Sequence, residues 1–239
     1  MGFAMVFGMR FAPLVLVACA HSVPNQTSEC RSSFPELDLH ATPRADPALE
    51  QLAISMCPTC VTADPETYAR LERDVAAIKA ANPDVSTLVH RPRHDGKTLL
   101  VKLSDPAETA VLAGDYAEWD CLNEELGFER EHLWENTNWA ELASPGTYNS
   151  EMLVEPYLDL DGIEYVEPNY SSGDGGNICA TAGEETWTYV FRNGWGDCPA
   201  GCIDSEYWHF SVLGETVTLL DYAPSDAAVP GWAEGCARF

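Results

Sequence analysis

Short spacings between cysteine or histidine residues offer the first candidates for chemistry in this sequence. Cys57-Pro58-Thr59-Cys60 is a CxxC motif, which becomes redox-active at the N-terminus of a helix because the helix dipole lowers the thiol pKa. Here the next predicted helix begins only at Asp64-Pro65. Cys198 and Cys202 could supply two thiolates to zinc, but their segment offers no second CxxC motif and no clear histidine pair to complete the ligand set. We therefore expect structural disulfides, no metal site and no cofactor.

Two histidines have a spacing that is typical of metal ligands on a helix. His90 and His94 form an HxxxH pattern, but Pro92 lies between them and interrupts a helix at that point. The run His90–His94 is therefore predicted to be an exposed loop, and it is the most basic patch of an acidic chain. His209 lies in a predicted strand, where a packing or solvent-facing role is the default.

The common catalytic motifs are missing from the sequence. It contains no G-x-S-x-G nucleophile elbow, no phosphate-binding loop and no dinucleotide fingerprint. The stretch Asp159–Gly162 begins like a calcium loop but lacks the later ligands, and it is predicted to be a turn. A Ser/His/Asp triad is a spatial arrangement, so the sequence leaves that possibility open. We name no catalytic residue on this basis.

The nine cysteines indicate an oxidising compartment, because reducing conditions disfavour such a number. Cys19 ends an apolar N-terminal run, and the other eight divide at Tyr170 into two sets of four. We expect each set to form its own disulfide framework, with three possible pairings in each. The candidates are Cys30, Cys57, Cys60 and Cys121 before Tyr170, and Cys179, Cys198, Cys202 and Cys236 after it.

Residues 1–18 have the make-up of a secretory signal peptide, with one early arginine, an apolar stretch and small residues before the cleavage point. Leu16-Val17-Ala18-Cys19 resembles the lipobox of bacterial lipoproteins. That resemblance implies that Cys19 is acylated, with palmitate among the acyl groups, and becomes the first mature residue. Two or three acyl chains anchor a protein stably in a membrane, whereas one is marginal. Met9 is an alternative start of the chain.

The residues after the predicted lipid site bear on localisation. Ala20 and His21 stand there, and not the aspartate that signals retention in the inner membrane. We therefore expect export to the cell envelope, with the outer membrane favoured, either on its periplasmic face or at the cell surface.

Charge excludes some partners and favours others. The chain has 239 residues, with 13 Lys+Arg against 38 Asp+Glu and a formal net charge of −25. Nucleic acid is excluded, because phosphate backbones bind through basic residues. Within 105–170, Arg130 is the one basic residue against 17 acids. We therefore expect a cationic protein as a partner, with a salt-dependent association rate. The sequence does not indicate an oligomeric state.

The N-terminal elements follow from composition and capping signals. Residues 19–50 are rich in Ser, Pro, Asn and Ala and are predicted to form a flexible tether. A helix is predicted over Pro65–Ala81, because Asp64 can cap it and proline suits the first helical position. We expect residues 51–96 to be a helical segment that packs on the middle domain.

Residues 97–170 and 171–239 differ in their patterns. For residues 97–170, the pattern predicts a strand over 98–103, a helix from 105 to about 127 that Gly114 can split, a hairpin over 128–143, a helix over 149–160 and a strand over 163–166. Their order is βαββαβ. The second region has four short strands between turns. The predicted fold class is α+β, a ferredoxin-like βαββαβ middle domain followed by a small disulfide-stapled antiparallel β domain.

The end of the middle domain carries a second resemblance. Gly162–Tyr170, with the sequence GIEYVEPNY, resembles the closing strand of subtilisin-type protease propeptides. Such propeptides have a ferredoxin-like fold, and they chaperone and inhibit the protease that follows them. Their sheet packs on the enzyme and their C-terminal tail lies in its cleft. The resemblance implies partner contacts by Ile163, Tyr165, Val166, Glu167, Pro168, Asn169 and Tyr170.

Two features of this chain depart from that family. The 69 residues after Tyr170 are too few for a subtilisin catalytic domain, and they continue directly from Tyr170 as another module. We therefore expect a lipid-anchored, extracytoplasmic, non-catalytic binding module that is inhibitor-like toward a protease. An extracytoplasmic hydrolase with a dispersed site and a structural envelope protein remain as alternatives.

Overall fold

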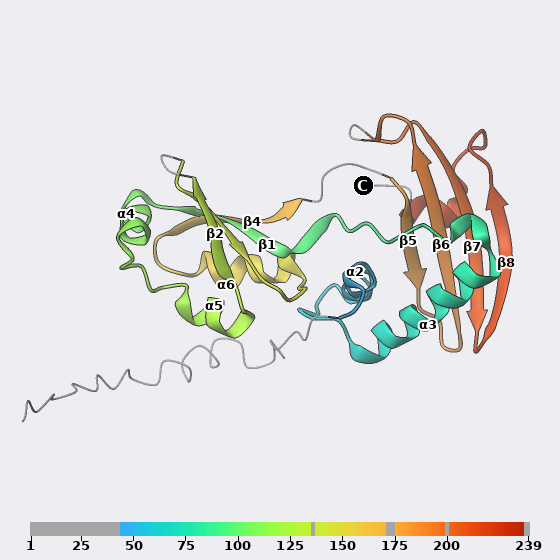
Figure 1. The fold of residues 1–239 in the computed structure, drawn as a ribbon, viewed down its shortest axis with the longest axis horizontal. Coiled ribbons are helices and arrows are strands. Elements are labelled where there is room, and N and C mark those ends of the chain that lie inside the picture. The colour runs from blue at the N-terminus through green and yellow to red at the C-terminus, as the bar shows by residue number, and fades with distance from the viewer. Residues whose placement is uncertain (1–43, 135–136, 171–174, 199–200, 237–239) are drawn as a thin grey trace, which may run out of the picture.

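The computed structural model describes residues 44–134, 137–170, 175–198 and 201–236. Two four-stranded antiparallel sheets dominate it (Figure 1): sheet A has the order β2-β3-β1-β4, and sheet B has the order β5-β6-β7-β8. The predicted mixture of helices with antiparallel strands is confirmed. The signal peptide, Cys19, Cys30 and residues 20–43 of the predicted tether lie outside the described residues.

Sheet A and its helices occupy the middle of the chain. Its strands are β1 (His94–Leu103), β2 (Glu129–Trp134), β3 (Trp139–Ala143) and β4 (Ile163–Tyr170). The helices between them are α4 (Asp105–Ala113), α5 (Asp120–Leu126), η2 (Ser150–Leu153) and α6 (Val154–Leu158). All four helices contribute to one core cluster with the inward side chains of the strands, so they cover a single face of the sheet.

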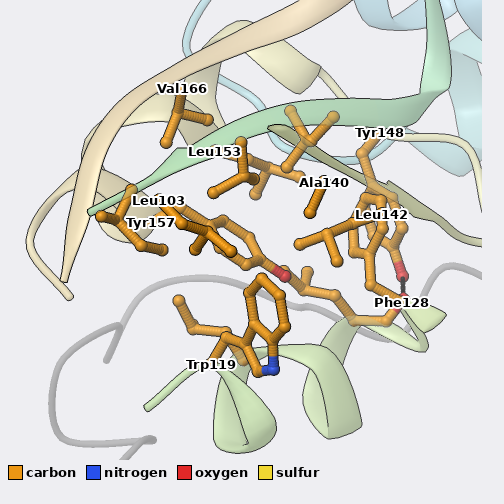
Figure 2. Packing of buried hydrophobic residues seen from close by; sticks show 14 of the residues in the cluster. Leu103, Trp119, Phe128, Ala140, Leu142, Tyr148, Leu153, Tyr157 and Val166 are labelled. Atoms are coloured by element: carbon orange, nitrogen blue, oxygen red, sulfur yellow. Dashed lines mark hydrogen bonds between the residues drawn. The ribbon is translucent and has the colours of Figure 1, made fainter. Parts of the chain in front are cut away.

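Aromatic side chains fill the centre of that core (Figure 2). Tyr157 is fully buried, and its hydroxyl donates a hydrogen bond to Asn123 Oδ1 at 2.7 Å. Burial raises the pKa of Tyr157 far above its ordinary value. Phe128 packs between Tyr148 and Tyr157, with ring centroids 5.8 and 6.1 Å away. These contacts tie α6 to α5 and to the segments that precede β2 and follow β3.

The helix predicted from residue 105 to about 127 is two helices in the structure. Gly114 ends α4 in the left-handed conformation, at φ +78°, which glycine adopts without steric cost. The N-cap of α4 is Ser104, whose side-chain oxygen accepts a hydrogen bond from the Ala107 backbone amide. The helix predicted over 149–160 is likewise shorter, because it divides into η2 and α6.

Sheet B is a meander of consecutive hairpins. It consists of β5 (Asn177–Thr181), β6 (Thr186–Trp195), β7 (Asp204–Leu213) and β8 (Thr216–Ala223). Helices α2 (Pro47–Ser55) and α3 (Pro65–Ala81), with η1 (Pro83–Val85), bury their apolar side chains against one face of this sheet. The segment η4 (Gly231–Cys236) packs on the other face.

The N-terminal helices differ from the prediction in two respects. Helix α2 begins at Pro47, inside the segment 19–50 that we expected to be a tether, because Asp46 caps it with hydrogen bonds to two backbone amides. Helix α3 has its predicted bounds, and its Tyr68, Leu71, Val75 and Ile78 are buried. Both helices pack on sheet B and not on the middle domain, since their buried apolar side chains share one core cluster with the inward side chains of β5, β6 and β7.

This packing makes the architecture nested. Helices α2 and α3 precede sheet A in the chain, and sheet B follows it, yet the helices and sheet B share one core. The sheet A unit is thus inserted into the unit that α2, α3 and sheet B form. Its two ends meet, because His94 at the start of β1 pairs with Tyr170 at the end of β4.

The described disulfide pairs keep within the two predicted sets. Cys57 pairs with Cys60, Cys179 with Cys236, and Cys198 with Cys202, while Cys121 is also disulfide-bonded. The Cys179–Cys236 bridge ties η4 to β5 at the edge of sheet B. In the part of the chain that the structure describes, no helix is both long and apolar enough to cross a bilayer.

Candidate functional site

The face of sheet A that points away from its helices carries aromatic and charged side chains. Residues alternate along a strand, so this outer face presents the neighbours of the core residues. We define the outer face by Leu100, Lys102, His132, Trp134, Trp139, Glu141, Tyr165 and Glu167. Trp134 is 40% exposed and Tyr165 is 49% exposed, which is high for large aromatic side chains.

The aromatic side chains of the outer face contact one another across the strands. Trp139 on β3 and Tyr165 on β4 both pair with Lys102 of β1, and their rings meet edge to face at 5.9 Å. On β2, the rings of His132 and Trp134 lie 4.7 Å apart. The Glu167 carboxylate, which accepts a hydrogen bond from the Tyr165 hydroxyl at 3.3 Å, raises the pKa of Tyr165. The result is an aromatic surface with acidic groups at its edge.

The residues of the propeptide-like strand divide between two environments. Tyr165 and Glu167 lie on the outer face, and Tyr170 at the end of β4 is exposed. Ile163, Val166 and Pro168 are buried, the first two in the core of sheet A, while Asn169 is half-buried. Because β4 is an edge strand that pairs with β1 alone, its other edge is open within the described residues. Only part of the predicted contact set is therefore accessible to a partner.

A second candidate site is a cleft where the two units join. It has a volume of about 350 Å³ and is lined by the end of α2, the run from His90 to His94, the segment before η2, and the first residues of β5. Gln51 of α2 reaches across it, with its side-chain amide 3.3 Å from the Asp95 carbonyl oxygen. The predicted basic loop is thus a wall of this cleft. The expectation that it is exposed is wrong for most of it, because His90 is buried and Arg91, Pro92 and His94 are half-buried against the cleft.

The two histidines of the cleft are held in different ways. His90 Nδ1 donates to the Ile178 carbonyl oxygen at 2.8 Å, and burial lowers the pKa of this imidazole. His94 Nε2 lies 3.0 Å from Glu151 Oε1, and its ring packs on Tyr170 at 4.7 Å. The second ring nitrogen of each histidine is buried and has no hydrogen-bond partner among the described residues.

The side chains that contact His90 and His94 limit the reactions that this cleft could catalyse. A nucleophile with its base requires a hydroxyl or thiol within hydrogen-bond reach of the imidazole. In the described parts of the chain, neither histidine is hydrogen-bonded to a serine, threonine or cysteine side chain. Those parts also hold no group of three or more His, Cys, Asp and Glu side chains that could bind a metal ion. The His94–Glu151 pair alone resembles part of a catalytic arrangement.

The remaining residues singled out from the sequence lie apart from both sites or at their margins. Cys57-Pro58-Thr59-Cys60 forms a disulfide loop after the C-terminal end of α2, where the helix dipole does not favour a thiolate. His209 stacks on Trp232 of η4 with ring centroids 4.9 Å apart, and burial lowers its pKa. His209 therefore has the packing role, one of the two roles that we expected for it.

Sequence reasoning did not identify the outer face or the cleft. Predicting the outer face requires the order of the strands in the sheet, although the alternation of apolar and polar residues in Trp139–Ala143 was one local signal for it. The cleft brings together segments from α2, β5 and the end of the chain, and no local pattern indicates that assembly.

Comparisons with known proteins add no relative to this description. No protein-family model, curated protein or solved structure matches the chain.

Proposed function

We propose that the protein is a non-catalytic binding module, anchored by lipid on Cys19 to the bacterial envelope, and that sheet A binds a protease in the manner of a subtilisin-type propeptide. The outer membrane is the favoured location. The observation that carries the proposal is the outer face of sheet A, which leaves Trp134 and Tyr165 exposed while helices cover the opposite face.

A ferredoxin-like topology of the sheet A unit is part of this proposal. It is supported by the chain order β1, α4 with α5, β2, β3, α6, β4 and by the spatial order β2-β3-β1-β4. In such a fold, helices pack on one face of the sheet and the other face is available to a partner. The resemblance of GIEYVEPNY to a propeptide strand supports the choice of a protease as that partner.

The continuation of the chain after Tyr170 affects the mode of binding. A propeptide inserts its free C-terminal tail into the protease cleft, whereas this chain continues into β5. The proposed contact therefore relies on the outer face and on the open edge of β4. Exposed aromatic side chains are the residue type that most often dominates binding energy at protein interfaces.

The test is to incubate the purified mature protein with a panel of subtilisin-type proteases, measuring complex formation by gel filtration and inhibition by peptide hydrolysis. We expect W134S with Y165S to weaken the complex at least tenfold, as loss of central aromatic contacts does. W195S is the matched control, because Trp195 is comparably exposed on sheet B. Absence of both complex and inhibition would remove the protease-binding function.

The hydrolase alternative is favoured by one observation, the contact of His94 with Glu151 inside the cleft. A positioned imidazole of this kind can act as a general base. Assays of the mature protein with activated esters and short peptides test this reading, with H94Q as the variant that must abolish turnover. If no substrate is turned over, the non-catalytic module or the structural envelope protein remains.

A further inference from the structure

The free edge of sheet B is unusual for an edge strand. β8 pairs with β7 alone among the described residues, and seven of its eight residues are exposed or half-buried. Leu219 and Leu220 are each 49% exposed. Edge strands of monomeric proteins are normally protected by charges, proline or a covering element. The run Thr216–Leu220 contains no charged residue and no proline, so its backbone is open to pairing.

A groove lies beside this edge, between β8 and the segment that follows α3. Its volume is about 620 Å³, and it is lined by Asn82, Asp84, Glu206, Trp208, Leu219 and Tyr222. The rings of Trp208 and Tyr222 lie 5.4 Å apart and form its apolar wall. Asp84 and Glu206 are its two carboxylates. An aromatic wall beside carboxylates suits a lysine or arginine side chain.

The groove is held in shape by hydrogen bonds to one carboxylate. Glu206 Oε2 accepts from the Tyr222 hydroxyl at 2.8 Å, and Glu206 Oε1 accepts from Asn193 Nδ2 at 3.0 Å. The hydrogen bond to Glu206, with further influence from Asp84 and Asp226, raises the pKa of Tyr222. The carboxylate is thus fixed beside the ring before any ligand arrives.

The sheet B side of the groove is acidic. Residues 193–236 contain no lysine or arginine, and their seven acidic residues are Asp197, Asp204, Glu206, Glu215, Asp221, Asp226 and Glu234. A second copy of this chain paired through β8 would bring two surfaces of the same negative charge together. A basic segment would instead meet opposite charge at Asp221 of β8 and at the groove carboxylates of Glu206 and Asp84.

We propose that β8 is a docking edge for an extended, basic segment of a partner protein. The segment adds to sheet B as a further strand beside β8 and places one lysine or arginine side chain in the groove of Trp208, Tyr222, Glu206 and Asp84. Backbone pairing supplies affinity and the groove supplies selectivity, which is the usual division in strand addition. This surface is separate from the outer face of sheet A.

The probe is a fluorescein-labelled nine-residue peptide in which lysine alternates with valine or threonine, titrated with the full mature protein and followed by anisotropy. Three comparison peptides separate the contributions. One replaces every lysine with glutamate, and the other two keep the lysines and carry N-methyl groups on one or the other set of alternate amides. We expect binding at least tenfold weaker for the glutamate peptide and for the N-methylated peptide whose blocked amides would face β8, but not for the peptide methylated on the opposite set. Equal affinities of the two N-methylated peptides would overturn strand addition, because charge alone would then explain the binding.

Variants of the protein test the groove itself. E206Q with D84N should weaken binding of the lysine peptide at least fivefold, whereas E124Q with E131Q, an equal change in net charge on the sheet A unit, should not. Equal weakening by both pairs would overturn the groove assignment. Light scattering of the unliganded protein completes the test, because a dimer that the lysine peptide cannot dissociate would show that a second copy occupies β8.

Discussion

The Tyr189 hydroxyl on β6 donates a hydrogen bond to Asp74 Oδ2 of α3, at 2.8 Å, inside the core that joins the N-terminal helices to sheet B. The Asp74 side chain is fully buried, and Arg70 and Arg73 contact its two oxygens at 2.6 and 3.0 Å. Burial, with a further contribution from this hydrogen bond, raises the pKa of Tyr189 far above its ordinary value. This cluster connects two elements that lie 115 residues apart in the sequence.

Removing the charge of Asp74 should destabilise the protein. We expect D74N to lower the free energy of unfolding by about 2–3 kcal/mol, because it leaves two guanidinium groups beside a neutral side chain. Y189F should cost about 1–2 kcal/mol, the usual contribution of a hydrogen bond to a charged group. R73Q is the control and should cost less than about 1 kcal/mol, because the Arg73 side chain is 53% exposed. Urea unfolding measures all three, and equal losses would contradict the central role of Asp74.

Stability should fall as the solution is acidified through the range in which histidine titrates. Burial lowers the pKa of His90 below its unfolded value of 6.5. The unfolded state therefore binds a proton on His90 more readily than the folded state does. The contribution of this group to the free energy of unfolding is complete above pH 6.5 and declines below it, by at most about 1.4 kcal/mol per pH unit. We expect H90N to flatten this decline between about pH 5 and pH 7 in urea unfolding.

The disulfides should differ in what they contribute to stability. The bridge from Cys179 to Cys236 spans 57 residues, whereas that from Cys57 to Cys60 spans 3. In the chain-entropy account, the longer loop stabilises by about 4 kcal/mol and the shorter by about 2 kcal/mol. We therefore expect C179A with C236A to lower the midpoint of urea unfolding more than C57A with C60A does. The reverse order would indicate that strain or residual structure outweighs loop entropy.

The lipid anchor is tested by one substitution. Because the proposed anchor is acyl chains on Cys19, C19A should abolish incorporation of labelled palmitate and move the protein from the membrane fraction to the soluble fraction. C121A serves as the control, since Cys121 is disulfide-bonded and should not affect labelling. Palmitate labelling that persists in C19A would contradict the lipobox assignment.

Local signals in the sequence located most elements but not all of them. Asp64-Pro65 identified the start of α3, where the Asp64 carboxylate accepts a hydrogen bond from the Thr67 backbone at 2.8 Å. This bond lowers the pKa of Asp64. The same pair of residue types, Asp46-Pro47, starts α2, but the composition of its surroundings favoured a tether. A capping signal therefore outweighs the composition of the flanking segment when apolar residues follow at helical spacing.

The partners of these elements could not be predicted in the same way. The apolar face of α3 with Leu71 and Val75 fits any apolar sheet face of suitable size, and two such sheets follow in the chain. The choice of sheet B depends on contacts with β6 and β7, more than a hundred residues away, such as that between Asp74 and Tyr189. The outer face of sheet A and the junction cleft depend on the same long-range choices, which is why neither was apparent.

The pairing of His94 with Tyr170 also has a consequence for the order in which the protein folds. Contacts between α3 and sheet B require closure of a loop of more than a hundred residues, and such closure is slow when the loop is an open chain. Once the sheet A unit has folded, its two ends lie side by side, with the His94 and Tyr170 rings 4.7 Å apart. The loop that remains to be closed then consists only of the short segments that connect the sheet A unit to α3 and to β5. We therefore expect the sheet A unit to acquire hydrogen-exchange protection before α2, α3 and sheet B do, so that the inserted unit acts as the folding nucleus for the unit that surrounds it.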